Sequence, residues 1–374
     1  MSHLGYMEKL LDGVEVEWKE LNTLTKVLRG KRLVKSQLSD NEEFPVYHGG
    51  LQPLGYYNSS NRPADTVMII NVGASAGTVG YSSTEFWSSD GCFCIEHSKL
   101  LNNKYLYYVL IGYQHLLRSK VRLAGIPTLD SIIVERLQIP IPPLNVQAEI
   151  VRILDTFTEL TAELTAELTA RQQQYAYYRE QLLTSFNDDK TEIKTLKDIV
   201  IMKAGQHISA SKISANKSTS HIYPCFGGNG IRGFVDEKSH DGSYLLIGRQ
   251  GALCGNVHRM SGEFYATEHA VVVTAKDGIN IDWAFHKLTL MNLNQYASKS
   301  AQPGLAVGKL AGLKVSVPSL DEQKRIAAIL DKFEAITASL TEGLPREIEL
   351  RQQQYEYYRD LLLSFPKPEV VTHD

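Results

Sequence analysis

A polar and aromatic segment occurs twice in this chain, half a chain length apart. Residues 171–186 read RQQQYAYYREQLLTSF, and residues 351–365 read RQQQYEYYRDLLLSF. The match extends upstream, where LQIPIPPLNVQAEIVRILD at 137–155 corresponds to LKVSVPSLDEQKRIAAILD at 313–331, 176 positions further on. A repeat of this length predicts that the chain contains two copies of one structural unit.

Further upstream the two copies match more weakly. IINVGASAGTV aligns with LIGRQGALCGNV at a spacing of 178 positions, and GIPTL at 125–129 aligns with AQPGL at 301–305. The spacing drifts by a few residues, so the loops differ in length while the scaffold is kept. The two halves therefore cover about 1–186 and 187–374.

The first part of each half is predicted to be rich in β-structure. TVMIINVG, YLLIGRQG and AVVVTAK are short aliphatic runs bounded by glycine and polar residues, which is typical of strands. HGGLQPLG and FGGNGIRG are dense in glycine and predict turns. One helix is expected to begin near Lys104, and its counterpart near Asp282. Each part is interpreted as mixed α/β, with an irregular, mostly antiparallel sheet.

The last part of each half is predicted to be a long helix. No proline or glycine occurs between Gln147 and Ser185, and the apolar residues recur every three or four positions. About 40 helical residues span on the order of 60 Å, and such a helix needs a partner for its apolar stripe. The predicted seams are Ile150, Ile153, Phe157, Leu160, Leu164, Leu168, Tyr175, Tyr178 and Leu182, and Ile326, Ile329, Phe333, Ile336, Leu340, Leu344, Ile348, Tyr355, Tyr358 and Leu362.

We therefore expect an α+β fold in which two mixed α/β domains are joined by two long helices. The helices are predicted to form an antiparallel coiled coil, which gives the internal repeat a pseudo-two-fold character. TAELTAEL at 161–168 is a tandem tetrapeptide, interpreted either as an adjustable spacer or as a repetitive sequence that a coiled coil tolerates. Gly343 and Pro345 are expected to kink or break the second helix.

The sequence lacks the motifs of common enzymes. It contains no G-x-x-x-x-G-K-[ST], H-E-x-x-H or G-x-S-x-G pattern. GASAGTVG follows a predicted strand, but its spacing does not fit a dinucleotide fingerprint, and its recurrence in the second half favours a repeated tight turn. We therefore expect no catalytic residue, no metal site and no cofactor bound by this chain.

The bulk properties are typical of a cytoplasmic protein. Four cysteines without zinc-finger spacing predict buried, reduced thiols. No signal peptide is recognised, and no segment approaches the roughly 20 apolar residues that span a membrane.

Basic residues cluster locally although 39 basic and 42 acidic residues nearly balance. KVLRGKRLVK, RSKVR and KAGQHISASKISANK contain no acidic residue, and further donors lie on predicted turns. Lysine and arginine contact phosphates, while arginine and amide side chains on loops can read base edges. These clusters predict DNA contacts, and the alternative is an ordinary solvated surface. The predicted DNA-binding residues are Lys31, Arg32, Lys35, Arg62, Arg118, Lys120, Arg122, Lys203, His207, Lys212, Lys217, Arg232, Arg249, Gln250, Arg259 and Lys299.

Taken together, the duplicated I-x-x-I-L-D-x-F, the twin RQQQYxYYR segments and the TAEL tandem are similar to the specificity subunit of type I restriction-modification systems. The resemblance implies target-recognition domains at 1–146 and 187–322, a central spacer helix at 147–186, and a distal helix with a C-terminal tail at 323–374. Each domain would read one half of a split double-stranded DNA target, and the spacer would set the gap.

The same resemblance implies the partners. Two methyltransferase subunits, which bind S-adenosylmethionine, and two restriction/translocase subunits would assemble on this chain. The repeated segments would present equivalent docking surfaces, since exposed aromatic residues and arginine favour interfaces. Some tyrosines must instead pack the seam, with Tyr175/Tyr355 and Tyr178/Tyr358 favoured. The predicted interface residues are Arg171, Tyr177, Arg179, Arg351, Tyr357 and Arg359. Two other classes stay open: a coiled-coil interaction scaffold without DNA recognition, and a nuclease with an unrecognised site.

Overall fold

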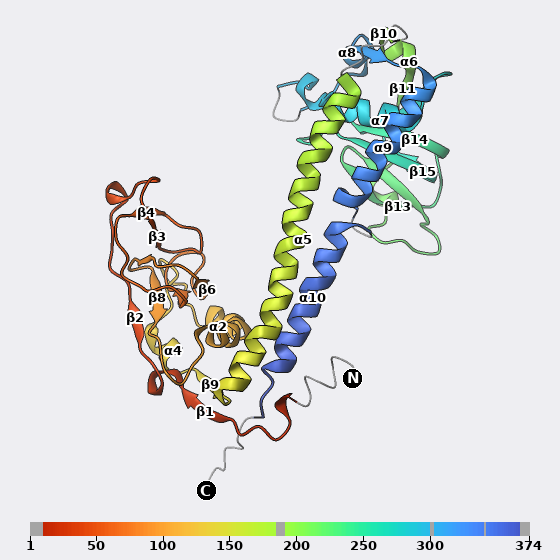
Figure 1. The fold of residues 1–374 in the computed structure, drawn as a ribbon. Helices are drawn as coiled ribbons and strands as arrows, with labels where there is room; N and C mark the ends of the chain where they lie inside the picture. The colour runs from red at the N-terminus through yellow and green to blue at the C-terminus, as the bar shows by residue number, and fades with distance from the viewer. Residues whose placement is uncertain (1–9, 185–190, 300–302, 340–341, 367–374) are drawn as a thin grey trace. The chain divides into compact units, whose positions relative to one another are not determined.

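The computed structural model describes residues 10–184, 191–299, 303–339 and 342–366. The chain folds into two compact units (Figure 1). Unit 1 comprises the residues up to Leu164 together with those from Ile348 onward, and unit 2 comprises Thr165–Glu347. Each unit therefore combines segments from both halves of the sequence.

Unit 1 contains three small sheets and a layer of helices. A four-stranded sheet has the order β2-β8-β5-β6, a three-stranded sheet has the order β4-β3-β7, and β1 pairs with β9. Within the described residues of this unit, the strand pairings are antiparallel except that of β3 with β7. The strands are β1 (Glu17–Glu20), β2 (Val27–Arg29), β3 (Phe44–Tyr47), β4 (Gly55–Tyr57), β5 (Thr66–Ile70), β6 (Val79–Ser82), β7 (Trp87–Ser88), β8 (Cys92–Ile95) and β9 (Gln138–Ile141). The short helices are η1 (Leu21–Thr23), η2 (Lys35–Gln37), α2 (Asn103–Gly112), α3 (Gln114–Ser119) and α4 (Ser131–Glu135).

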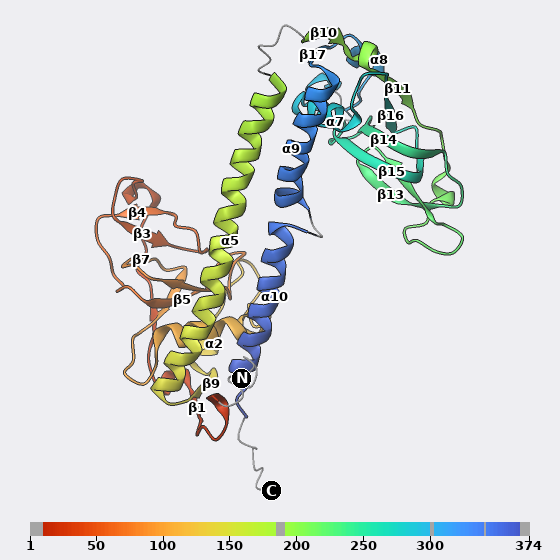
Figure 2. The same ribbon diagram turned by 45° about the vertical axis from the view of Figure 1, so that its right-hand side comes forward.

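Unit 2 gathers most of its strands into one sheet. Its order is β11-β16-β14-β15-β12-β13, which places β13 at an edge (Figure 2), and β10 pairs separately with β17. Among the paired strands of the described part of unit 2, only β12 and β15 run parallel. The strands are β10 (Glu192–Thr195), β11 (Val200–Ala204), β12 (Tyr223–Gly227), β13 (Gly230–Val235), β14 (His240–Gly248), β15 (Val257–Ala266), β16 (Ala270–Ala275) and β17 (Lys314–Val317). The short helices are α6 (Leu196–Ile199), η3 (Ala210–Lys212), α7 (Ile281–Leu290), η4 (Leu293–Tyr296) and α8 (Val307–Ala311).

The predicted strands and helices are largely confirmed. The three aliphatic runs form β5, β14 and β16, and the two expected short helices are α2 and α7. The turn predicted from FGGNGIRG is too long, because Gly230–Val235 forms β13 and only Gly228 and Asn229 connect it to β12. All four cysteines are free and buried, as expected.

The long helices begin earlier than predicted and differ from one another. α5 is one helix from Leu144 to Thr184, so its first half belongs to unit 1 and its second half to unit 2. The second tail forms two helices, α9 (Leu320–Ala338) and α10 (Leu344–Leu362). The predicted break is confirmed: Gly343 adopts φ 81° just before α10, and Pro345 fits in its first turn, where its missing N–H is not needed.

Only part of the predicted seam is buried. In unit 1, Ile150 and Leu362 are fully buried, and α10 runs alongside the first half of α5 in the opposite direction (Figure 2). In unit 2, Ile326 is buried, and Leu183 rather than Leu182 takes the fully buried place. Leu160 and Ile336 are exposed, so they do not belong to the seam, and Leu340 lies outside the described residues.

Two buried glutamines fix the start of these helices in equivalent ways. Gln147 accepts a hydrogen bond from the Asn102 N–H (2.8 Å) and donates to the Pro142 and Leu100 carbonyls (2.8 and 3.1 Å). Asn102 itself caps α2. Because the repeat predicts that the two halves fold alike, the same contacts are expected around the counterpart of Gln147 in unit 2.

Gln323 reproduces the arrangement in unit 2. It accepts from the Asn280 N–H (2.8 Å) and donates to the carbonyls of Pro318 (2.9 Å) and Gly278 (3.2 Å). Asn280 caps α7 just as Asn102 caps α2. Each glutamine therefore joins a long helix to the capped start of a shorter helix.

Candidate nucleic-acid interface

The glycine-rich segment after β5 is a tight turn that recurs after β14. Gly77 and Gly255 both have positive φ angles, 84° and 94°. Their N–H groups donate to the carbonyls of Ile70 (2.7 Å) and Gly248 (2.8 Å). A Cβ on Gly77 would lie 2.9 Å from the Arg118 backbone, so only glycine fits there. Strand β6 follows the first turn, which supports the structural interpretation of this motif.

The aligned segments GIPTL and AQPGL hold these turns in the same way. Gly73 donates to the Pro127 carbonyl and Gly251 to the Pro303 carbonyl, both at 2.9 Å. Ala301 and Gln302 lie outside the described residues. The two halves thus position one loop pair by identical backbone contacts.

In unit 1 the predicted basic residues fall into two exposed groups. Lys31, Arg32 and Lys35 are exposed in the segment that follows β2. The second group follows α3, where Lys120 and Arg122 line a surface cavity of 470 Å³ together with Arg29, which lies on β2.

Two further unit 1 residues have internal partners. Arg118, although exposed, donates to the Thr78 hydroxyl at 3.0 Å. Arg62 is half-buried and donates to the carbonyls of Asn61 (2.7 Å) and Arg29 (2.9 Å). Arg62 therefore ties the β2 end to a neighbouring loop, a role that the sequence did not indicate.

In unit 2 most predicted residues are exposed, and they lie on loops, on β11 and β13, and in η3. His207 pairs with Glu268 at 2.9 Å, and Arg249 is half-buried. The exposed members are Lys203, His207, Lys212, Lys217, Arg232, Gln250 and Lys299.

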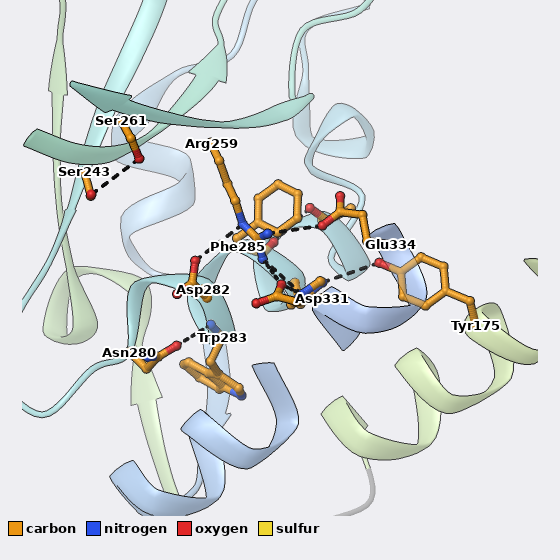
Figure 3. A network of polar contacts seen from close by, with 12 residues as sticks. Tyr175, Ser243, Arg259, Ser261, Asn280, Asp282, Trp283, Phe285, Asp331 and Glu334 are labelled. Carbon is orange, nitrogen blue, oxygen red and sulfur yellow. Dashed lines mark hydrogen bonds and ion pairs between the residues drawn. The ribbon is translucent and has the colours of Figure 1, made fainter. Parts of the chain in front are cut away.

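Arg259 is the exception, because it lies inside a network of acidic side chains (Figure 3). Its guanidinium forms ion pairs with Asp331, with Glu334 (3.2 Å) and with Asp282 (3.6 Å). It also stacks over the Phe285 ring, 4.0 Å from the centroid. We therefore assign Arg259 an intramolecular role and leave it out of the residues proposed to contact DNA.

His286 completes this network. It is fully buried and lies 2.8 Å from the Asp331 carboxylate. Burial lowers the pKa of His286 and raises the pKa of Glu334. His286, Asp331 and Glu334 lie close enough to share a metal ion, but the Arg259 guanidinium contacts all three and supplies the positive charge.

Unit 1 builds the equivalent contact with different residues. Asp155, the counterpart of Asp331, accepts from Lys104 Nζ (2.9 Å) and from the Tyr108 hydroxyl (2.5 Å). Tyr108 occupies the place of His286. The cation lies on helix α2 in unit 1 and on strand β15 in unit 2, so the helix aspartate is neutralised in both units from different elements.

The repeated aromatic segments pack as predicted, each against the long helix of the other half. In unit 2, Tyr175 and Tyr178 stack on Phe333, with ring centroids 6.0 and 5.7 Å apart. In unit 1, Tyr358 stacks on Phe157 at 5.2 Å, and Tyr355 is also half-buried in the core. The prediction that Tyr175, Tyr355 and Tyr358 pack the seam is confirmed, whereas Tyr178 stacks on Phe333 but is 40% exposed.

The intervening tyrosines point outward. Tyr177 is 61% exposed and Tyr357 is 58% exposed. Nearby arginines lie over the packed rings, Arg179 over Tyr175 (5.3 Å) and Arg359 over Tyr355 (5.7 Å).

The remaining two predicted interface residues make polar contacts within their own helices. Arg171 pairs with Glu167 at 2.9 Å, and Arg351 donates to Gln354 at 3.1 Å. Their part in a protein interface stays a prediction.

Comparisons with known proteins agree with this architecture. The family model described as the type I restriction modification DNA specificity domain matches residues 13–171 and again residues 188–350. The EcoprrI specificity subunit of Escherichia coli is 47% identical over 91% of this chain and 93% of its own length. The EcoR124I/EcoR124II specificity subunit of the same organism is 35% identical over the full length of both.

A solved structure shares the fold. The type I restriction-modification S subunit from M. genitalium superposes with a TM-score of 0.67 at 17% identity, over 96% of this chain and 98% of that one. The duplicated α+β architecture and the family match over both halves together place the chain in a DNA-specificity class of protein. This chain belongs to the type I restriction modification DNA specificity family and is a DNA sequence specificity subunit. No helix among the described residues is long and apolar enough to cross a membrane.

Proposed function

We propose that each unit reads one half of a split double-stranded DNA sequence. The observation that carries this proposal is the contrast between fixed and varied positions. The contacts of Gln147 and Gln323 and the glycine turns are the same in both units, whereas the exposed loops beside them differ. Two equal scaffolds with different surfaces suit a target with two unlike halves.

The spacing between the halves is set, in this proposal, by helix α5. The TAELTAEL segment lies in the middle of α5, and the boundary between the two units falls inside it, after Leu164. One more TAEL would lengthen the helix by about 6 Å. Because duplex DNA rises about 3.4 Å per base pair, the gap would grow by one or two base pairs.

The partners follow from the family. We propose that two methyltransferase subunits, which carry S-adenosylmethionine, dock at the equivalent surfaces around Tyr177 and Tyr357. Two restriction/translocase subunits would complete the complex in the cytoplasm. This chain would bind no cofactor and perform no catalysis itself, and its part would be to choose the DNA sequence.

A TAEL insertion after Leu168 tests the proposal. Methyladenine would be mapped by single-molecule sequencing of DNA from cells that contain the variant and its methylating subunit. We expect the same two half-sites with a gap longer by one or two base pairs. Replacing Glu163 and Glu167 with glutamine is the matched control, because it changes charge but not length, and should leave the gap unchanged. Altered half-sites in the insertion variant would refute the spacer role.

A further inference from the structure

Two loops of unit 2 touch through their backbones. One is the two-residue turn between β12 and β13, and the other follows β14. A Cβ on Gly228 would lie 2.6 Å from the Gln250 carbonyl oxygen, and a Cβ on Gly248 would lie 2.0 Å from the Gly228 carbonyl oxygen. No side chain fits between these backbones, so the two loops form one rigid edge.

Three hydrogen-bonding side chains lie on or beside this edge, with Asn229 in the turn, Gln250 in the second loop and Arg232 on the adjoining strand β13. Asn229, Arg232 and Gln250 are all exposed. The Asn229 carbonyl accepts only a long hydrogen bond, 3.5 Å, from the Asn256 amide. Neither the Arg232 guanidinium nor the Gln250 amide has a hydrogen-bond partner among the described residues. The edge therefore has a fixed backbone that carries donors and acceptors with bonding capacity left for a ligand.

The chemistry of these side chains fits base edges better than phosphates. Asparagine and glutamine pair bidentately with adenine, and arginine pairs bidentately with guanine, in the major groove. We infer that Asn229, Arg232 and Gln250 read the bases of the half-site bound by unit 2, while lysines elsewhere contact phosphate. This inference rests on the DNA recognition proposed above and assigns it to particular residues.

The corresponding segment of unit 1 is a longer loop between β3 and β4 with other side chains. A Cβ on Gly49 would lie 3.5 Å from the Val72 carbonyl oxygen, and a Cβ on Gly50, the counterpart of Gly228, would meet nothing within 4 Å, so the two loops approach less closely than in unit 2. The positions that carry Asn229 and Arg232 in unit 2 carry Leu51 and Leu54 here, 178 residues earlier, and both leucines are exposed. The alignment is secure, because the neighbouring Gly55 and Gly233 share φ angles of 159° and 157°.

This difference explains how one scaffold reads two sequences. Amide and guanidinium groups form hydrogen bonds with purine edges, whereas leucines make apolar contacts of the kind that recognise the thymine methyl group. The close backbone approach differs as well, since Ile70 stands at the position of Gly248. The two half-sites are therefore expected to differ in the bases that these positions contact.

The test is a binding selection with the full-length chain in complex with its methylating subunit. Bound fragments from a randomised duplex pool would be sequenced for the wild type, Gln250→Ala and Arg232→Lys. Each variant should lose about 5- to 150-fold discrimination at one base position of one half-site and keep the other half-site. Arg232→Lys keeps the charge but not the bidentate geometry, so its salt dependence should stay the same.

The control is Gln138→Ala, which removes an exposed amide from β9 of unit 1 and should leave both half-sites unchanged. If both edge variants bind with unchanged base preferences, this inference is wrong while the proposed function stands. If the wild-type complex selects no sequence, both are wrong. Since the edge side chains are exposed, the variants are expected to fold normally.

Discussion

The buried amide of Gln323 allows a quantitative test of how unit 2 is held together. The side chain is 1% exposed and makes three hydrogen bonds to backbone groups, at 2.8, 2.9 and 3.2 Å. Gln323→Met keeps the approximate volume and removes all three. Each backbone group left without a partner costs about 1 kcal/mol or more, so unit 2 should lose at least about 3 kcal/mol of unfolding free energy.

Hydrogen exchange followed by mass spectrometry can localise this loss. Amides in α7 and α9 should exchange on the order of 100-fold faster in Gln323→Met, while the β5–β6 region of unit 1 is unchanged. In Gln147→Met, the faster exchange should occur in unit 1, and unit 2 should be unchanged. Gln353→Met, on the exposed face of α10, is the matched control and should change neither unit. Acceleration below tenfold, or an equal effect in both units, would contradict the reasoning.

Three further predictions concern partner binding, pH and salt. Tyr177→Ala combined with Tyr357→Ala should weaken assembly with the methyltransferase subunit without unfolding the chain, and unchanged assembly in native mass spectrometry would exclude that surface. Burial lowers the pKa of His286, so unit 2 should lose stability as the pH falls through about 6.5, the unfolded value. The urea midpoint of unit 2 should then fall less between pH 7 and 5 in His286→Gln than in the wild type. An equal fall of the urea midpoint in both proteins would show that His286 does not cause the acid loss of stability. Lys212→Ala combined with Lys217→Ala should reduce the slope of log affinity against log salt by about 0.9 per lost phosphate contact, and an unchanged slope would show that neither lysine contacts DNA.

Glu334 provides an internal check on the pH prediction. Burial raises its pKa, so the folded state takes up its proton first and gains stability as the pH falls. This opposes the effect of His286. Glu334→Gln should therefore make the acid loss of stability in unit 2 steeper. A shallower loss would show that the pKa of Glu334 is not raised in the folded state.

The parts of the fold that repeat could be predicted from the sequence. Gly77 and Gly255, in the turns after β5 and β14, stand at matching positions because a Cβ at either would collide with backbone, and the sequence shows this requirement directly. The tyrosines that stack on Phe157 and Phe333 were found by helical spacing combined with the repeat. The break before helix α10 is predicted by Gly343 and Pro345.

The contacts that differ between the two halves could not be predicted from the sequence. The sequence predicts Arg259 as a DNA contact on a turn beside His258, whereas the structure places it on β15. Its partners Asp331 and Glu334 are more than 70 residues away. The counterpart contact in unit 1 uses Lys104 on a helix, so even the repeat gave no indication of the pairing. The aspartate is the same in both halves, but its cationic partner comes from a different element in each, so the repeat does not reveal the pairing.

The most direct test of the central claim is the methylation pattern that this chain specifies. Genomic DNA from cells expressing it with its cognate methylating subunit would be read by single-molecule sequencing. We predict methyladenine on both strands of one split motif, with two unlike half-sites separated by a fixed gap. A single continuous motif, or no modification despite an assembled complex, would contradict the claim that the two units each read half of a DNA target.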